Sequence, residues 1–329
     1  MSSSSDTNGR AFEAIVFQLL TDTLKNLSLP YFITPEAFVR QKSDVRKLNL
    51  LAKKASNEEK SRKTHKDFQE NTYLIVDWIL EKFQLKTVEN ITLDKLSDVE
   101  GGRGDITDIR LLVEYPNSKK TVNLSLKNKS EALKHSRIGP IPSWIGFTDK
   151  KHPVRVAHHQ NIIETWNIIL NKIKALGVQN NIPIVNFNDL ALLNPYIEKY
   201  DEIYKAQHIY PCFYKIVEEF FISQSNSEKN VQLLFRYLMG FNYYKIINYD
   251  KYIKIIDFTE FTLPTKVEFS RDININNGYL TLVFNNGFEI AIRLHNGDNK
   301  LNHNLKCDAQ LVNLEELDIP ITKILKAKK

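Results

Sequence analysis

Cysteine is scarce in this chain, and long apolar runs are missing. The 329 residues include only two cysteines, Cys212 and Cys307, which are far apart and not part of a CxxC pair. This excludes a disulfide framework and a cysteine zinc site. No run of 18 apolar residues occurs, which excludes a transmembrane helix. The first residues lack the charged and apolar regions of a signal peptide, so we expect a cytoplasmic protein with no membrane partner.

Glycine is also sparse, and its one cluster, at residues 101–104, matches neither a P-loop nor a dinucleotide fingerprint. Its simpler task is to bring Asp105 and Asp108 close to a sheet. Hydrophobic residues form 42% of the chain, enough for one large domain or two ordinary ones. The net charge of +6 is compatible with a polyanionic partner but does not establish one. Basic residues concentrate in 40–66 and 127–155.

Apolar periodicity predicts helices over the first two thirds of the chain. The predicted helices span residues 11–24, 36–55, 67–83, 130–136, 154–176 and 187–248. From residue 265 the pattern changes to strands, because two Asn-Gly pairs, typical of hairpin turns, flank an apolar run. These turns predict an antiparallel meander of residues 265–275, 279–284 and 288–294.

The most informative feature is a predicted β-hairpin. Its two segments, which contain Asp108 and Lys127, each alternate apolar and polar side chains, as strands with one buried face do. A turn around Asn117-Ser118 places both apolar rows on one side. Asp108, Ser125 and Lys127 then share the opposite side, with Asp108 directly across from Lys127. A one-residue slip would put the lysine among apolar side chains, so burial fixes the parity of the pairing.

Two aspartates and a lysine at the open end of a hairpin are the groups that metal-assisted phosphodiester hydrolysis requires. Carboxylate oxygens suit Mg²⁺, and a nearby lysine can orient or deprotonate the attacking water and offset negative charge. Asp105, Asp108 and Lys127 provide this set. Asp108 and Lys127 would be the first carboxylate and the lysine of the PD-(D/E)xK nuclease pattern, whose acidic and lysine positions lie on adjacent strands. The alternative interpretation of Asp108 and Lys127 is a surface ion pair, since such pairs are common across hairpins and contribute little stability.

Ser125 departs from that pattern, because an acid is expected two residues before the lysine. Serine is a poor metal ligand, so another carboxylate must complete the site. Asp105 is the first candidate, Glu13 in the first helix is the second, and Glu131 is the third. Without such a replacement the protein would be a catalytically inactive DNA-binding relative.

Four sequence blocks together resemble the HaeIII-type family of type II restriction endonucleases. The blocks are Gly9-Arg-Ala-Phe-Glu13, Gly104-Asp-Ile-Thr-Asp108-Ile, Leu124-Ser-Leu-Lys127-Asn with Ala132-Leu-Lys134-His135-Ser-Arg137, and Ile292-Arg-Leu-His295-Asn296 with Leu305-Lys306-Cys-Asp308-Ala-Gln-Leu. They are scattered over nearly the whole chain, and the Ser-x-Lys form fits that family. Cys307 stands where an aromatic residue is expected.

The resemblance implies Mg²⁺-dependent double-strand cleavage of DNA at a short palindrome, as one half of a restriction-modification system. A cognate DNA methyltransferase would be its functional partner, and GGCC is the site associated with the family's name. A palindromic target calls for a homodimer or for two sequential single-strand cuts. The alternatives are a non-catalytic, sequence-specific DNA-binding protein and an RNA-directed nuclease.

The resemblance and the hairpin together assign catalysis and metal binding to Asp108, Asp105 and Lys127, with Glu13 in support. The expected DNA contacts are Lys129, Lys134, His135 and Arg137 after the hairpin, and Arg293, His295, Asn296, Lys300 and Lys306 on a second surface. The alternative for the two histidines is an ordinary structural hydrogen bond. For the lysines it is a solvated face.

The predicted fold is α/β of a mixed α+β type. A PD-(D/E)xK-type core with a mixed central sheet flanked by helices is joined by a helical N-terminal part and a C-terminal antiparallel β meander. We expect four parts: residues 1–90, helical and contributing to the core; 91–180, the catalytic core; 181–260, a helical region; and 261–329, a β-rich part for DNA recognition.

Overall fold

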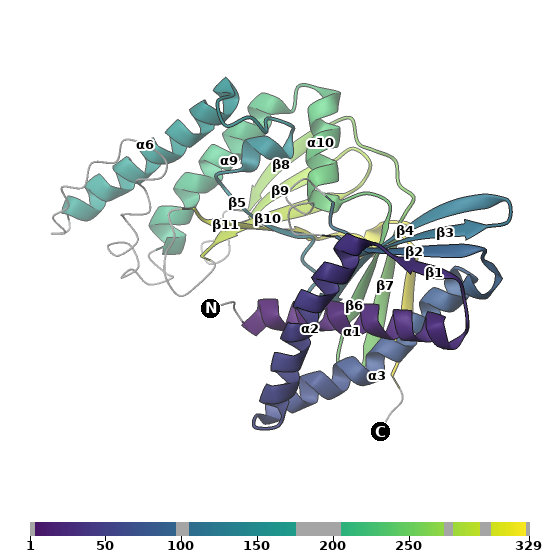
Figure 1. The fold of residues 1–329 in the computed structure, drawn as a ribbon. Coiled ribbons are helices and arrows are strands. Elements are labelled where there is room, and N and C mark those ends of the chain that lie inside the picture. Colours follow the sequence, from purple (N-terminus) through teal and green to yellow (C-terminus); the bar gives the residue numbers. More distant parts are fainter. Residues whose placement is uncertain (1–3, 97–104, 176–204, 273–278, 297–303, 327–329) are drawn as a thin grey trace. The chain divides into compact units, whose positions relative to one another are not determined.

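The computed structural model describes residues 4–96, 105–175, 205–272, 279–296 and 304–326. The chain divides into two compact units, each assembled from segments that are distant in the sequence (Figure 1). The first unit comprises Met1–Glu131, Gly240–Phe261 and Ile319–Lys329, and the second comprises Ala132–Met239 and Thr262–Asp318. Both units mix helices with a β-sheet, so the fold belongs to the mixed α/β class. None of the described helices is long and apolar enough to cross a membrane.

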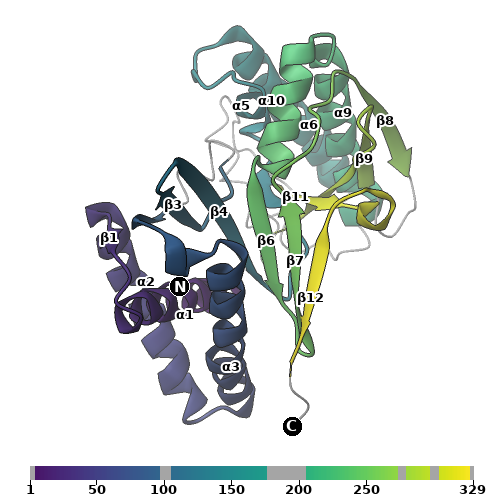
Figure 2. The same cartoon turned by 90° about the vertical axis from the view of Figure 1, so that its right-hand side faces the viewer.

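The first unit is built on a seven-stranded mixed sheet. In spatial order its strands are β1 (Tyr31–Ile33), β2 (Asn90–Lys95), β3 (Ile109–Tyr115), β4 (Ser118–Asn128), β6 (Tyr243–Asn248), β7 (Tyr252–Phe258) and β12 (Ile321–Leu325). β1 runs parallel to β2 and β4 parallel to β6, while the other neighbours are antiparallel. Figure 2 shows how β6, β7 and β12 continue the sheet beyond the hairpin of β3 and β4.

Helices α1 (Ser4–Asn26), α2 (Pro35–Ala55) and α3 (Glu59–Lys82) pack in the first unit, followed by the 3₁₀ turn η1 (Leu85–Thr87). They confirm the helices predicted over 11–24, 36–55 and 67–83. The start of α2 follows from its sequence, since the Thr34 hydroxyl accepts a 3.1 Å hydrogen bond from the Ala37 N–H and Pro35 occupies the first turn. Apolar side chains of α1 and α3, with Phe12 and Ile79 among them, share one core with the sheet.

The hairpin of β3 and β4 has the predicted parity but a different register. Ile109 pairs with Leu124, a register shifted by two residues from the predicted one, in which Asp108 would face Lys127. The prediction was wrong by two residues because the turn is formed by residues 116 and 117. Proline has no N–H to contribute to a β-ladder and its fixed φ suits a turn, so Pro116 leaves the strand.

The second unit contains a five-stranded antiparallel sheet. In spatial order its strands are β5 (Lys134–Arg137), β11 (Lys306–Leu311), β10 (Glu289–His295), β9 (Tyr279–Phe284) and β8 (Val267–Asp272). The other elements are α5 (Ile141–Trp144), α6 (Pro153–Ala175), the π-helix η3 (Lys205–Ile209), α9 (Tyr210–Gln224), α10 (Glu228–Met239) and the 3₁₀ turn η4 (Leu314–Glu316). Helix α9 contacts β9 and β10, whose apolar side chains are buried.

These elements confirm the predicted meander and the helix at 154–176 as far as the structure describes them. Two helix predictions were wrong. Residues 134–137 form strand β5, because β11 offers them an antiparallel partner. Residues 243–248 form β6, because aromatic and β-branched side chains favour a strand that is buried throughout. The glycine cluster 101–104, the turn at 277–278 and residues 187–204 of a predicted helix lie outside the described residues.

Candidate active site

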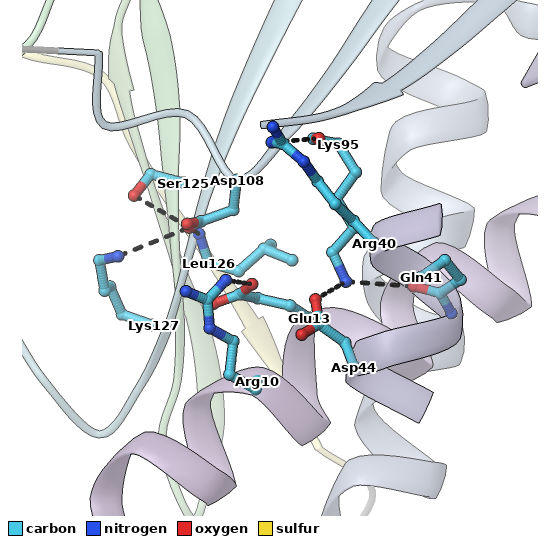
Figure 3. A network of polar contacts seen from close by, with 10 residues as sticks. All are labelled: Arg10, Glu13, Arg40, Gln41, Asp44, Lys95, Asp108, Ser125, Leu126 and Lys127. Carbon is cyan, nitrogen blue, oxygen red and sulfur yellow. Dashed lines mark hydrogen bonds and ion pairs between the residues drawn. The ribbon is translucent and has the colours of Figure 1, made fainter. Parts of the chain in front are cut away.

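Asp108 lies at the start of β3 and is fixed by the main chain of β4. Its N–H donates to the Leu124 carbonyl at 2.8 Å, and its carboxylate accepts the Leu126 N–H at 2.6 Å. The same carboxylate oxygen lies 3.4 Å from the Ser125 hydroxyl and 3.5 Å from Lys127 Nζ (Figure 3). The structure therefore brings Asp108, Ser125 and Lys127 together, with Asp108 directly before the first paired residue of β3.

Glu13 approaches this site from helix α1. It is buried, its carboxylate lies 3.4 Å from the Arg10 guanidinium, and its side chain points toward the strands that carry Asp108 and Lys127 (Figure 3). Burial, and then the charge of Asp108, raise the pKa of Glu13 to about 8, against the opposing charges of Arg10, Lys95 and Lys127. Glu13 therefore holds a proton at neutral pH unless another cation enters the site.

The other two candidate acids are engaged elsewhere. The Asp105 carboxylate forms a 2.5 Å ion pair with Arg110 and accepts the Thr107 N–H at 3.0 Å. The Glu131 carboxylate is bound by the Tyr249 hydroxyl and, at 3.1 Å, by Lys254. Glu13 is the acid that lies close enough to Asp108 for the two charges to interact.

A hard cation fits the pair of Glu13 and Asp108. Two carboxylates in a partly buried site are costly to ionise together, and a divalent ion removes that cost while accepting oxygen ligands. Among the described residues, no cluster of three or more His, Cys, Asp or Glu side chains is arranged to bind a metal. Two protein ligands are nevertheless usual for Mg²⁺, which keeps several waters.

A comparison with protein families gives this site its context. A family model described as HaeIII restriction endonuclease matches residues 9–315, nearly the whole chain. The chain belongs to the HaeIII restriction endonuclease family. It is therefore a type II site-specific deoxyribonuclease, a DNA-binding hydrolase of restriction-modification systems. Searches of curated proteins and of solved structures found no match.

The HaeIII-family enzyme has a second buried charge next to the candidate site that the sequence analysis missed. Lys95 is 1% exposed, and its Nζ lies 2.6 Å from Asp44 and donates a 3.1 Å hydrogen bond to the side-chain amide oxygen of Gln41 (Figure 3). The charge of Lys95 lowers the pKa of Glu13 against the effect of burial. The sequence did contain a signal for a buried polar site on α2, because Gln41 and Asp44 share one helix face with the apolar residue Ala37.

Lys245 is a further buried lysine that sequence reasoning overlooked. It is the register partner of Ser125 on β6, and its Nζ donates a 2.6 Å hydrogen bond to the Glu131 carbonyl. Burial, and then the charge of Lys127, lower the pKa of Lys245 to about 7. The sequence signal for a buried lysine was a single lysine inside the apolar run 243–247. The prediction of a helix there gave no reason to expect this lysine to be buried.

The residues expected to contact DNA fall in both units. Lys129 belongs to the first unit and pairs with Asp250. In the second unit, His135 and Arg137 lie on β5, Arg293 and His295 on β10 with Asn296 directly after it, and Lys306 on β11. Lys134 is in β5, but its side chain, like the whole of Lys300, lies outside the described residues. The sequence analysis gave no role to Asp308, which joins the two histidines.

Proposed function

We propose that this HaeIII-family endonuclease makes Mg²⁺-dependent double-strand cuts in DNA at a palindrome, with GGCC as the expected sequence. It would act in the cytoplasm beside a cognate DNA methyltransferase, either as a homodimer or by two sequential cuts. The observation that carries the proposal is the convergence of Asp108, directly before β3, with Lys127 of β4 and Glu13 of α1.

A PD-(D/E)xK-type core is part of this proposal. β2, β3 and β4 form an antiparallel meander, β4 is followed in the sheet by the parallel strand β6, and α1 packs against β4. Asp108 directly precedes the second strand of the meander and Lys127 is near the end of the third. Ser125, two residues before Lys127, lies 3.4 Å from Asp108 but has no carboxylate. Glu13 would therefore supply the acid that position 125 lacks.

Asp108 and Glu13 would hold Mg²⁺, which when bound neutralises phosphate charge and activates water. Asp108 is already oriented for this role by the Leu126 N–H. Glu13 must first release its proton, since its pKa is about 8. Asp105 remains a candidate ligand, although Arg110 now binds its carboxylate.

Lys127 is the proposed partner of the attacking water. Its Nζ is 3.5 Å from Asp108 and its side chain is only partly exposed, so its position is restrained without being buried. A cationic Nζ offsets charge that develops on the phosphate, and a neutral Nζ can accept the proton of the water. Both roles require the Lys127 amine to lie close to Asp108.

Cleavage of unmethylated phage DNA by wild type and by Lys127→Ala tests the proposal. We expect discrete fragments with Mg²⁺, none with EDTA, and a loss of about 100-fold or more in the variant. Lys119→Ala is the matched control, because Lys119 is an exposed lysine at the other end of β4, paired with Glu114. The fragment ends give the recognition sequence. Equal cleavage by Lys127→Ala and wild type would rule out the proposed site.

A further inference from the structure

The second unit contains a cluster in which one carboxylate joins two histidines. His135 Nδ1 lies 2.6 Å from one oxygen of Asp308, and His295 Nε2 lies 2.6 Å from the other. The three side chains come from β5, β11 and β10, three adjacent strands of the sheet. Both oxygens of Asp308 are therefore engaged, and the two rings are held at fixed positions.

Both ring nitrogens of His295 have partners inside the cluster. Its Nδ1 lies 2.6 Å from the Asn296 carbonyl, which can only accept, and its Nε2 faces the Asp308 carboxylate. Burial opposes ionisation of Asp308, but the hydrogen bonds from His135 and His295 hold its pKa well below the usual range. Both ring nitrogens of His295 are therefore engaged within the cluster, so this ring anchors Asp308.

His135 has a different environment. Its Nδ1 faces Asp308, while its side chain is 62% exposed. An N–H on Nδ1 is fixed by this carboxylate, so the Nε2 edge is the one left for an outside partner. A histidine whose ring is oriented by a carboxylate is typical of residues that make a directed hydrogen bond.

The face of the sheet that carries these residues is strongly cationic. Cys307 and Ala309 point into the core, so Lys306 and Asp308 lie on the opposite face of β11. The register places Arg137 and His135 beside them on β5, and His295 and Arg293 beside them on β10. Three permanent cations, Lys306, Arg137 and Arg293, therefore lie on the same face as Asp308.

We propose that Asp308, anchored by His295, is a positioning residue that holds the His135 ring on this face so that its Nε2 edge meets DNA. Nε2 would meet either a phosphate oxygen, with the ring protonated and donating, or an amino group at a base edge, with the neutral ring accepting. This inference rests on the proposed function, and it adds the residues that make the contact. Arg137, Lys306 and Arg293 provide the surrounding positive charge.

The sign of the effect of Asp308→Asn separates this proposal from simple electrostatics. Removing a negative charge from a cationic face strengthens binding to a polyanion if charge alone matters. We expect the opposite, a loss of about tenfold in affinity, because the histidines lose their orientation. His135→Ala should show a loss of similar size.

Binding is measured by fluorescence anisotropy in EDTA, with two duplexes of equal length. One carries the sequence found at the fragment ends (expected GGCC) and the other lacks it. A loss for the first duplex alone assigns a base contact, and an equal loss for both assigns a phosphate contact. Lys215→Ala is the control, because it removes an exposed cation on α9, paired with Glu219. Thermal unfolding checks that each variant is folded.

Histidine-selective ¹⁵N NMR gives a readout that does not depend on DNA. The neutral His135 ring, assigned through His135→Gln, should carry its proton on Nδ1 in the wild type, and less so in Asp308→Asn. Binding by Asp308→Asn that equals or exceeds wild type would overturn the proposal, even if the enzyme cleaves DNA. Conversely, a wild type that binds DNA without cutting it would contradict the proposed function and leave these binding comparisons valid.

Discussion

The charge of Asp108, directly before β3, raises the pKa of Glu13 on α1, an effect second only to burial. Two acids from segments about a hundred positions apart thus share one site, and the ionisation of one opposes that of the other. This coupling leads to measurable consequences for stability, for metal binding and for cleavage.

Glu13→Gln should change how stability depends on pH. The folded protein keeps a proton on Glu13 up to about pH 8, whereas the unfolded chain releases it near 4.5. Between these values the folded state binds more protons, so the free energy of unfolding falls as pH rises. The shift corresponds to on the order of 4 kcal/mol.

Glutamine mimics the protonated acid, so the variant should lose this part of the pH dependence and exceed wild type in stability at pH 8. Urea unfolding in EDTA at pH 5, 6.5 and 8 measures it. Glu81→Gln, an exposed change on α3, is the control. Parallel pH profiles for Glu13→Gln and wild type would contradict the assignment of the proton to Glu13.

Added Mg²⁺ should stabilise the wild type, and more at pH 8 than at pH 6. The ion and the proton compete for Glu13, and a ligand that binds only the folded state raises the free energy of unfolding, by about 2.7 kcal/mol at a hundred times its dissociation constant. Asp108→Asn should lose most of this gain. Thermal unfolding with and without Mg²⁺ tests it, and an equal gain in both proteins would place the ion elsewhere.

Substitution of the two candidate acids should separate their roles. Glu13→Gln is expected to reduce cleavage by about 100-fold or more, while Asp105→Asn should cost less than about tenfold. The reason is that Arg110 binds Asp105, whereas Glu13 interacts with Asp108. Single-turnover cleavage at saturating enzyme measures both, with DNA affinity in EDTA as the control. The reverse order of effects would assign the metal to Asp105.

Removing one partner of the buried ion pair between Lys95 and Asp44 should lower the free energy of unfolding strongly. Lys95→Met leaves Asp44 without its 2.6 Å ion pair and should cost about 3 kcal/mol. The double variant Lys95→Met with Asp44→Leu should recover most of that loss. Urea unfolding of the wild type, Lys95→Met, Asp44→Leu and the double variant gives the coupling free energy between the two side chains. Additive effects would show that the two charges do not act as a pair.

Much of the first unit could be predicted from local sequence. The helices at 11–24, 36–55 and 67–83 follow from apolar spacing, and the parity of the hairpin follows from its alternating rows. These features depend on neighbours a few residues away, so the sequence contains their cause. The same holds for the meander of β8, β9 and β10, as far as it is described.

The amino-acid sequence by itself thus determined the polar face that carries Asp108, Ser125 and Lys127. Tertiary structure decided the rest of the site, because burial and distant pairing have no local pattern. Pro116 set the register, packing of α1 brought Glu13 to Asp108, and β6 brought Lys245 beside Ser125. In the second unit, three strands from distant parts of the chain had to pair before Asp308 could hold His135 and His295.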